Sequence, residues 1–182
     1  MQELILERRR RHSGAPARRL VTLAMISAAL MAVTSAPLHA QATPRDSVLA
    51  VVQEFFRAMT ANDSAAAART VHPEGVNYVM STRGDSAVLS RSTFAGFLGT
   101  LARNQRTFVE RMWEPTVMVH GPIAVVWTPY DFHIDGTFSH CGVDAFSLAR
   151  SGAGWRIVTI TYTVERTGCK PSPLGPVKKQ DD

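Results

Sequence analysis

The alternation of apolar and polar side chains is strongest in the C-terminal half of the chain, from about residue 123 to residue 164. The runs in this region are rich in Val, Ile, Thr, Phe, Tyr and Trp, which suit a half-buried pleated surface. Asp135-Gly136 favours a two-residue type I′ hairpin turn, because both residues tolerate positive φ. Ser151-Gly152-Ala153-Gly154 predicts a second turn. We therefore predict three consecutive antiparallel strands here.

Apolar residues recur at three- and four-residue spacing near the start of the folded region, which is typical of helices. Thr43 followed by Pro44 resembles a helix start, with a capping side chain and a proline at the first helical position. These signals predict a first helix over about 45–60. Asn62-Asp63 is a second capping signal, and it predicts a short helix that ends near Val71.

The middle of the chain mixes both periods. Residues 75–80 alternate as a strand does, and 81–87 are predicted as a loop. Ser90 or Ser92 is expected to cap a third helix, and residues 108–119 return to a period of two. The predicted order is helix, helix, strand, helix and four long antiparallel strands, which makes an α+β domain with its helices on one face of the sheet.

The first 40 residues have the pattern of a secretory signal peptide. A basic region that ends at Arg18-Arg19 precedes an apolar run over 20–33, and small residues follow as far as Ala40. The apolar run is shorter than the ~20 residues that a membrane span requires. We therefore expect an exported protein, periplasmic or secreted, that is cut after Ala36 or Ala40 and keeps no membrane span; an uncleaved anchor is the alternative.

Removing this leader leaves 14 basic and 13 acidic residues of the 20 and 15 in the whole chain. The rest of the protein is therefore nearly neutral, which argues against nucleic-acid binding. Residues 44–168 are expected to form the folded domain. Residues 169–182 contain three prolines and a charged end, so they predict a disordered tail.

Two cysteines, Cys141 and Cys169, remain after the leader. An oxidising compartment permits a disulfide between them, which would fasten the tail to the sheet. The alternative is two free thiols, with Cys141 buried as a small apolar residue.

Two stretches carry a resemblance to a known superfamily. They are VVQEFFRAMTANDSAAAARTVHPEGVNYV and YDFHIDGTFSHCGVDAFSLARSGAGWRIVTITYTV, which together cover most of residues 46–165, and the Gly-Trp-Arg-Ile that ends at Ile157 is especially typical. In their order and spacing they resemble the NTF2-like superfamily, with its SnoaL-like, ketosteroid-isomerase-like and putative lumazine-binding groups. The resemblance implies a cone-shaped fold, in which a strongly bent antiparallel sheet wraps the long first helix and leaves a pocket. It does not settle activity, because one fold carries many functions.

The Asp135-Gly136 turn also predicts which strand residues face each other. A two-residue turn pairs Ile134 with Thr137, which places Asp131 opposite His140 and Trp127 opposite Asp144. One face then carries the larger aromatic side chains and most of the ionisable ones. Its residues are Trp127, Asp131, His133, Phe138, His140, Asp144, Phe146 and Leu148. A bulge in the hairpin would invert this assignment.

A histidine beside carboxylates can move a proton, so we predict that Asp131, His140 and Asp144 form a catalytic cluster. The alternative is a solvated cross-strand pair with no function. Further residues expected to bind the ligand and shape the pocket are Trp127, Tyr78, His133 and Phe146. No close-spaced ligand motif supports a metal, and no cofactor motif is present, so we expect neither.

Three functions remain open. The first is an exported protein with a pocket for a small apolar or aromatic molecule. The second is a cofactor-independent isomerase or cyclase that uses an Asp/His proton shuttle. The third is a protein-interaction module that forms a homodimer through the opposite sheet face, with the smaller side chains.

Overall fold

The computed structural model describes residues 42–83 and 86–177. The predicted leader lies outside these residues, as do the last five positions of the predicted tail. Within the described residues, no helix has the length and apolar content that crossing a membrane requires.

Three helices form where the capping signals predict them, with one change. Helix α1 (Pro44–Thr60) begins with a capping box, in which the Thr43 hydroxyl accepts from the Asp46 N–H while the Asp46 carboxylate accepts from Thr43. Helix α2 (Ser64–Thr70) is capped by Asp63. Helix α3 (Phe94–Leu101) is capped by Thr93 rather than by Ser90 or Ser92.

The cap moves because Ser90 and Ser92 belong to a strand. The chain forms a hairpin of β1 (Val71–Arg83) and β2 (Ser86–Thr93), and both strands extend into the predicted loop at 81–87. Strand β2 is an edge strand with mostly exposed, polar side chains. It therefore lacks the apolar alternation by which a strand is recognised in sequence.

The predicted strand over 108–119 is two strands. Strands β3 (Phe108–Met112) and β4 (Thr116–His120) are separated at Glu114, which has φ +47°. Both pair with β5 (Ile123–Ile134), β3 along its second half and β4 along its first. The left-handed backbone of Glu114 interrupts the predicted strand, while the side chains of β3 and of β4 each still alternate between the two faces of the sheet.

The last three strands form as predicted. They are β5, β6 (Thr137–Ser151) and β7 (Gly154–Val164), paired antiparallel in sequence order. The whole sheet has the order β2-β1-β7-β6-β5-β3, with β4 beside β5. Strand β7 runs parallel to β1, while the other neighbouring strands pair antiparallel as predicted. A period of two indicates strands but does not say which strands become neighbours.

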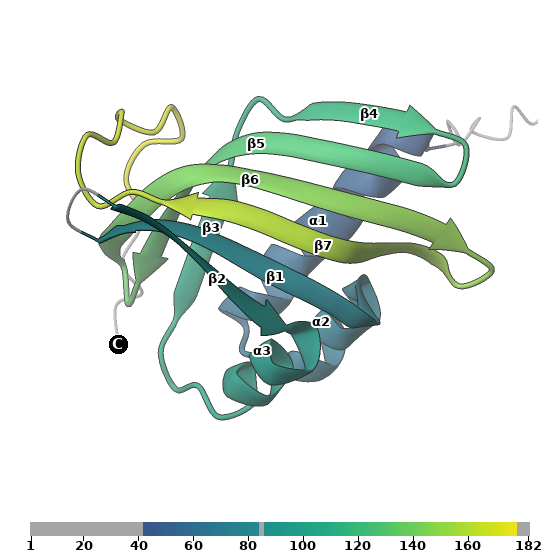
Figure 1. The fold of residues 1–182 in the computed structure, drawn as a ribbon, viewed down its shortest axis with the longest axis horizontal. Helices are drawn as coiled ribbons and strands as arrows, with labels where there is room; N and C mark the ends of the chain where they lie inside the picture. Colours follow the sequence, from purple (N-terminus) through teal and green to yellow (C-terminus); the bar gives the residue numbers. More distant parts are fainter. Residues whose placement is uncertain (1–41, 84–85, 178–182) are drawn as a thin grey trace, which may run out of the picture. The chain divides into compact units, whose positions relative to one another are not determined.

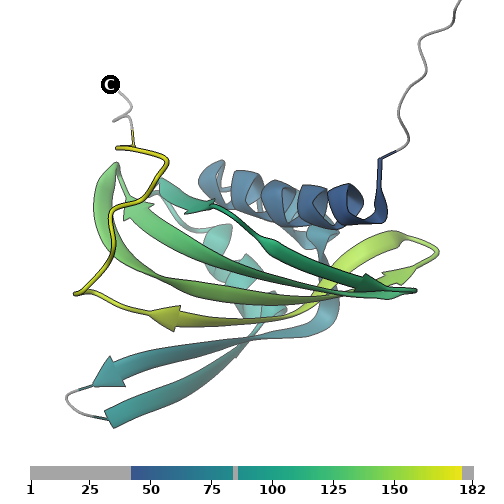
Figure 2. The same ribbon diagram turned by 90° about the horizontal axis from the view of Figure 1, so that it is seen from above.

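The helices and the sheet make the α+β fold expected from the sequence. Helix α1 lies against one face of the sheet, where it contacts β3, β4 and β7 (Figures 1 and 2). Its apolar stripe, which includes Val48, Val52 and Phe56, packs into one core with inward-facing residues such as Phe146 and Ile157. The same face of the sheet therefore supplies both the core and the space for a site.

The β5–β6 hairpin contains the feature that decides this face. The turn forms as predicted, with φ +51° at Asp135 and +72° at Gly136. His133 pairs with Phe138, but the next pair is Phe132 with His140, so Ser139 is an extra residue on β6. This β-bulge shifts the register by one residue for the rest of the hairpin.

The shift reverses half of the predicted face. Asp131 now lies opposite Cys141 and Trp127 opposite Ala145, so the predicted pairs with His140 and Asp144 were wrong. The inner face, towards α1, receives His140, Asp144, Phe146 and Leu148 from β6. The outer face receives Trp127, Asp131, His133 and Phe138.

Candidate functional site: an aromatic cavity with two acids

A cavity of about 160 Å³ lies between α1, α3 and the inner face of the sheet. Its lining combines apolar walls with a few polar groups, as is usual for ligand pockets. The apolar lining residues are Phe55, Phe56, Met59, Phe97, Phe108, Phe132, Phe146 and Ile160. The polar ones are Asn77, Glu110, Tyr130, His140, Asp144 and Tyr162.

The walls are built from pairs of aromatic rings. The rings of Phe55 on α1 and Phe97 on α3 lie 5.5 Å apart between centroids, and Phe132 stacks on the imidazole of His140 at 4.9 Å. Such contacts fix ring positions and add to the stabilisation from burial. The walls thus come from helices and strands, which hold a site more firmly than loops do.

Two carboxyl groups meet in this apolar space. Asp144 is only 1% exposed, and Glu110 is half-buried at the cavity surface. Burial raises the pKa of Glu110 well above its usual range, and the Asp144 charge and the hydrogen bond between the two side chains raise it further. Burial also raises the pKa of Asp144 to about 7, against the lowering effect of that hydrogen bond.

The pair therefore shares protons at neutral pH. Glu110 keeps its proton and donates it to Asp144, while Asp144 exchanges its own proton near pH 7. Asp144 Oδ2 meets no hydrogen-bond donor among the described residues. The cavity thus holds one negative charge when the pair is singly ionised.

The remaining polar groups are neutral. Burial lowers the pKa of His140 to about 4, and its Nδ1 lies 3.0 Å from Ser139 Oγ. The Tyr130 hydroxyl donates to the carbonyl of Thr163 at 2.6 Å, and burial raises the pKa of that phenol. Burial likewise raises the pKa of Tyr162 to about 12.

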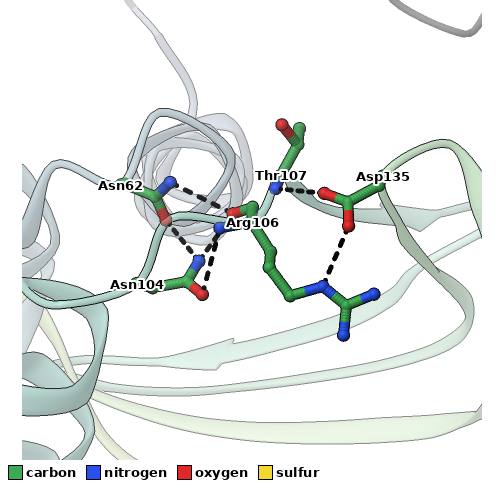
Figure 3. A network of polar contacts seen from close by, with 5 residues as sticks. All are labelled: Asn62, Asn104, Arg106, Thr107 and Asp135. Atoms are coloured by element: carbon green, nitrogen blue, oxygen red, sulfur yellow. Dashed lines mark hydrogen bonds and ion pairs between the residues drawn. The ribbon is translucent and has the colours of Figure 1, made fainter.

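A polar network fixes the start of the strand that carries Glu110 (Figure 3). Asn62, after α1, donates to the Arg106 carbonyl, as does Asn104. The Asp135 carboxylate of the hairpin turn accepts from the Thr107 N–H at 2.8 Å and from the Arg106 side chain at 2.9 Å. The end of helix α1, the entry to β3 and the β5–β6 turn are thereby tied together.

A second charged cluster lies on the outer face of the sheet. Arg111 and Asp131 are cross-strand neighbours and form two hydrogen bonds, one of 2.9 Å. His133 Nδ1 is 3.7 Å from the Asp131 carboxylate, and burial lowers the pKa of this histidine. Within residues 42–83 and 86–177, no three His, Cys, Asp or Glu side chains form a group that could hold a metal ion.

The structure separates the predicted site residues into two groups. His140, Asp144 and Phe146 line the cavity. Asp131, His133 and Trp127 lie on the outer face, so the predicted meeting of Asp131 with His140 and Asp144 does not occur. The cause is the bulge at Ser139. Because of this extra residue, the β6 residues from His140 onward face the cavity, while Asp131 and Trp127 of β5, predicted on the same face, point outwards.

Tyr78 does not line the cavity either. It pairs with Arg91 and Thr161 in the sheet, and the preceding residue, Asn77, faces the cavity in its place. The prediction followed aromatic character, whereas the face is decided by the alternation along β1.

Sequence reasoning did not select Glu110, which completes the acid pair. A signal for it was present, because Glu110 lies between Phe108 and Met112 on the apolar face of a period-two run. An acid on the apolar face of a strand points towards the core, and a buried acid marks a candidate site.

The two cysteines are joined. Cys141, on the outer face of β6, forms a disulfide with Cys169. This bond fastens the segment after β7 to the sheet, where Lys170 and Pro171 lie beside outer-face residues. The open choice between a disulfide and free thiols is thereby resolved.

Comparisons with known proteins agree with this geometry. Residues 43–163 match the family model described as putative lumazine-binding. No curated protein matches the sequence at a significant level. Solved structures of NTF2-like proteins confirm the predicted fold, and at these identities the likeness concerns the fold alone.

An NTF2-like protein from Cytophaga hutchinsonii has 11% identity and a TM-score of 0.56, and the match covers 67% of this chain and 98% of the Cytophaga protein. An NTF2-like superfamily protein from Salmonella enterica has 17% identity and a TM-score of 0.53, and the match covers 69% of this chain and 93% of the Salmonella protein. An NTF2-like protein with a cystatin-like fold from Novosphingobium aromaticivorans has 16% identity and a TM-score of 0.51, and the match covers 69% of this chain and 83% of the Novosphingobium protein.

Proposed function

Because the chain belongs to the putative lumazine-binding family of NTF2-like proteins, we propose that it is a binding protein for a small molecule with an apolar or aromatic ring. The observation that carries this proposal is the cavity itself, whose aromatic walls surround two acids that share a proton. Apolar walls contribute affinity and a few polar groups fix the orientation of a bound molecule.

The cavity volume limits the size of that molecule. A dry protein cavity of about 150 Å³ holds one benzene molecule, and this cavity measures about 160 Å³. One ring with a short substituent therefore fits inside, and a longer molecule extends through the opening.

Binding can be tested by NMR titration with 2-phenylethanol, a neutral one-ring compound. Chemical shifts should change and saturate for cavity-lining residues. The variant Ile160→Trp fills the cavity from β7 and should weaken binding at least about tenfold, since the ring loses its space. Thr161→Trp is the matched control, because the neighbouring side chain is exposed; it should bind as the unmodified protein does.

Two outcomes would contradict the proposal. One is the absence of saturable shifts at the cavity. The other is equal affinity in the folded Ile160→Trp and Thr161→Trp proteins, which would place binding elsewhere.

A cofactor-independent isomerase or cyclase is the second candidate, and the pKa of Asp144 near 7 favours it. An ionised Asp144 could take a proton from a carbon beside a carbonyl, while the C–H electron pair moves into an enolate. Protonated Glu110 would donate a hydrogen bond to the enolate oxygen, and Asp144 would return the proton to another carbon. Asp144→Asn should then abolish turnover of a carbonyl substrate with binding retained, whereas Asp131→Asn on the outer face should retain turnover.

Export remains part of the proposal. Its support is the leader pattern in residues 1–40, and the Cys141–Cys169 disulfide agrees with an oxidising compartment. N-terminal sequencing of the protein from its native cells should find a chain that begins after Ala36 or Ala40. A chain beginning at Met1 would contradict export with cleavage.

A further inference from the structure

We infer that the cavity selects ring compounds bearing a protonated amine or another strong hydrogen-bond donor, and that it rejects carboxylates and phosphates. This inference rests on the proposed function, because it names the chemical class of the molecule that the same cavity binds. It follows from the charges, the hydrogen-bonding groups and the dimensions of the cavity.

The charge balance of the lining is one-sided. Glu110 and Asp144 are its acids, and the lining contains no lysine or arginine among the described residues. Arg111, which follows Glu110 on β3, is held by Asp131 on the outer face. A ligand carboxylate or phosphate would therefore enter an apolar space with no opposite charge, which is strongly unfavourable.

The hydrogen-bonding groups of the cavity also favour a ligand that donates hydrogen bonds. Tyr130 already donates its hydroxyl proton to the Thr163 carbonyl. Asp144 Oδ2 is buried and has no hydrogen-bond partner within the described residues. An ammonium group between the two acids would supply donors to both carboxyls and would balance their charge, forming charge-assisted hydrogen bonds.

The walls suit the rest of such a molecule. Phe55 and Phe97 lie on the helix side, and Tyr162 and Phe132 line the sheet side. Aromatic faces attract cations as well as rings, more strongly where water is excluded. The volume of about 160 Å³ accommodates one ring with a short amine chain.

The acids make this selectivity depend on pH. The titratable groups that face the pair are His140 from β6, Tyr130 from β5 and Tyr162 from β7, all neutral near pH 7. Helices α1 and α3 contribute apolar side chains and β1 contributes the amide of Asn77; Asp131 acts on Glu110 from the outer face. Ionisation of the pair should therefore strengthen amine binding as pH rises through about 7.

Three compounds of nearly equal size test the inference: 2-phenylethylamine, 2-phenylethanol and phenylacetate. NMR titration of the whole chain at pH 8 should give at least about tenfold tighter binding for the amine than for the alcohol, as expected for hydrogen bonds to a charged group. The carboxylate should bind at least about tenfold more weakly than the alcohol. At pH 5.5 the amine, which keeps its proton as lysine does, should lose this advantage, while affinity for the alcohol stays the same.

The variant Asp144→Asn tests whether the charge of the acid pair, rather than the shape of the cavity, causes the preference for the amine. It should remove the preference for the amine and retain binding of the alcohol, since the cavity keeps its form. Glu74→Gln, at an exposed position on β1, is the matched control and should keep the preference.

The outcomes distinguish the two proposals. If none of the three compounds binds, both the proposed function and this inference are wrong. If the alcohol binds and the amine binds no tighter, or phenylacetate binds best, the inference is overturned and the binding function stands. If Asp144→Asn is folded and still prefers the amine, the acid pair is not the cause.

Discussion

Asp144 and Glu110 show at the residue scale how burial sets charge. Both acids hold protons that they would lose in the unfolded chain, because burial raises the pKa of each. An acid whose pKa is higher in the folded protein than in the unfolded chain lowers the unfolding free energy as the pH rises. The fall takes place between the pKa of the unfolded chain and the pKa of the folded protein. For Asp144 that window runs from about 4 to about 7.

Asp144→Asn should therefore change the pH dependence of stability. The variant should match the unmodified protein near pH 4 and exceed it at pH 8 by on the order of 3 kcal/mol, because it removes the cost of ionising a buried acid. Urea unfolding at the two pH values measures this difference. An equal difference at both pH values would show that Asp144 does not titrate in the cavity.

The sequence predicted part of the site at this scale. His140, Asp144 and Phe146 were selected because they share one side of an alternating strand, and they line the cavity. Glu110 was not selected, since its partner comes from a strand 34 residues later in the sequence, and strand alternation alone does not show which strands meet.

Among the secondary-structure elements, the β5–β6 hairpin has the largest effect on which side chains line the cavity. Its turn residues were readable from sequence, because Asp135 and Gly136 adopt the positive φ values that the dipeptide favours. The bulge at Ser139 was not readable, because serine fits a strand and a bulge equally well. One inserted residue therefore decided which side chains of the hairpin face α1.

Deleting Ser139 should disrupt the fold. With the turn unchanged, the deletion would direct His140, Asp144 and Phe146 to the outer face, which places a charge and a phenyl ring in the wrong surroundings. We expect a loss of more than about 4 kcal/mol in unfolding free energy, measured by urea unfolding.

Ser139→Ala is the control for this deletion. It removes the contact between Ser139 Oγ and His140 Nδ1 but keeps the bulge, so it should cost about 1 kcal/mol. A deletion variant as stable as the control would mean that the hairpin register is not fixed by the bulge.

The disulfide acts at the scale of the whole molecule. It joins Cys141 in the sheet to Cys169, 28 residues later. Replacing both cysteines with serine should lower the unfolding free energy by about 3 to 4 kcal/mol, because the unfolded chain regains the freedom that a loop of this length removes.

This loss can be measured by urea unfolding. Added reductant should lower the stability of the unmodified protein towards that of the double variant and should leave the variant unaffected. A double variant as stable as the oxidised protein would contradict a structural role for the bond.

A homodimer through the sheet remains a prediction. The face predicted for the dimer is the one that alternates with Trp127 and Asp131 on β5, and its residues Tyr130 and Phe132 point inwards to the cavity. The outer face carries Met118, Ile123 and Trp127 instead, each more than half exposed. Exposed apolar groups on adjacent strands can form an interface. Sedimentation equilibrium should show a dimer that Trp127→Glu weakens, and a monomer at micromolar concentration would contradict it.

The central claim, that a ring compound binds beside Glu110 and Asp144 inside the cavity, is tested most directly by a crystal structure. Crystals of the chain from residue 41 onward should be grown at pH 8 with 2-phenylethylamine. We expect the ring between Phe55 and Phe132, with the ammonium group within hydrogen-bond distance of both carboxyls. An empty cavity, a ligand bound elsewhere, or two carboxyls that point apart into solvent would contradict the claim.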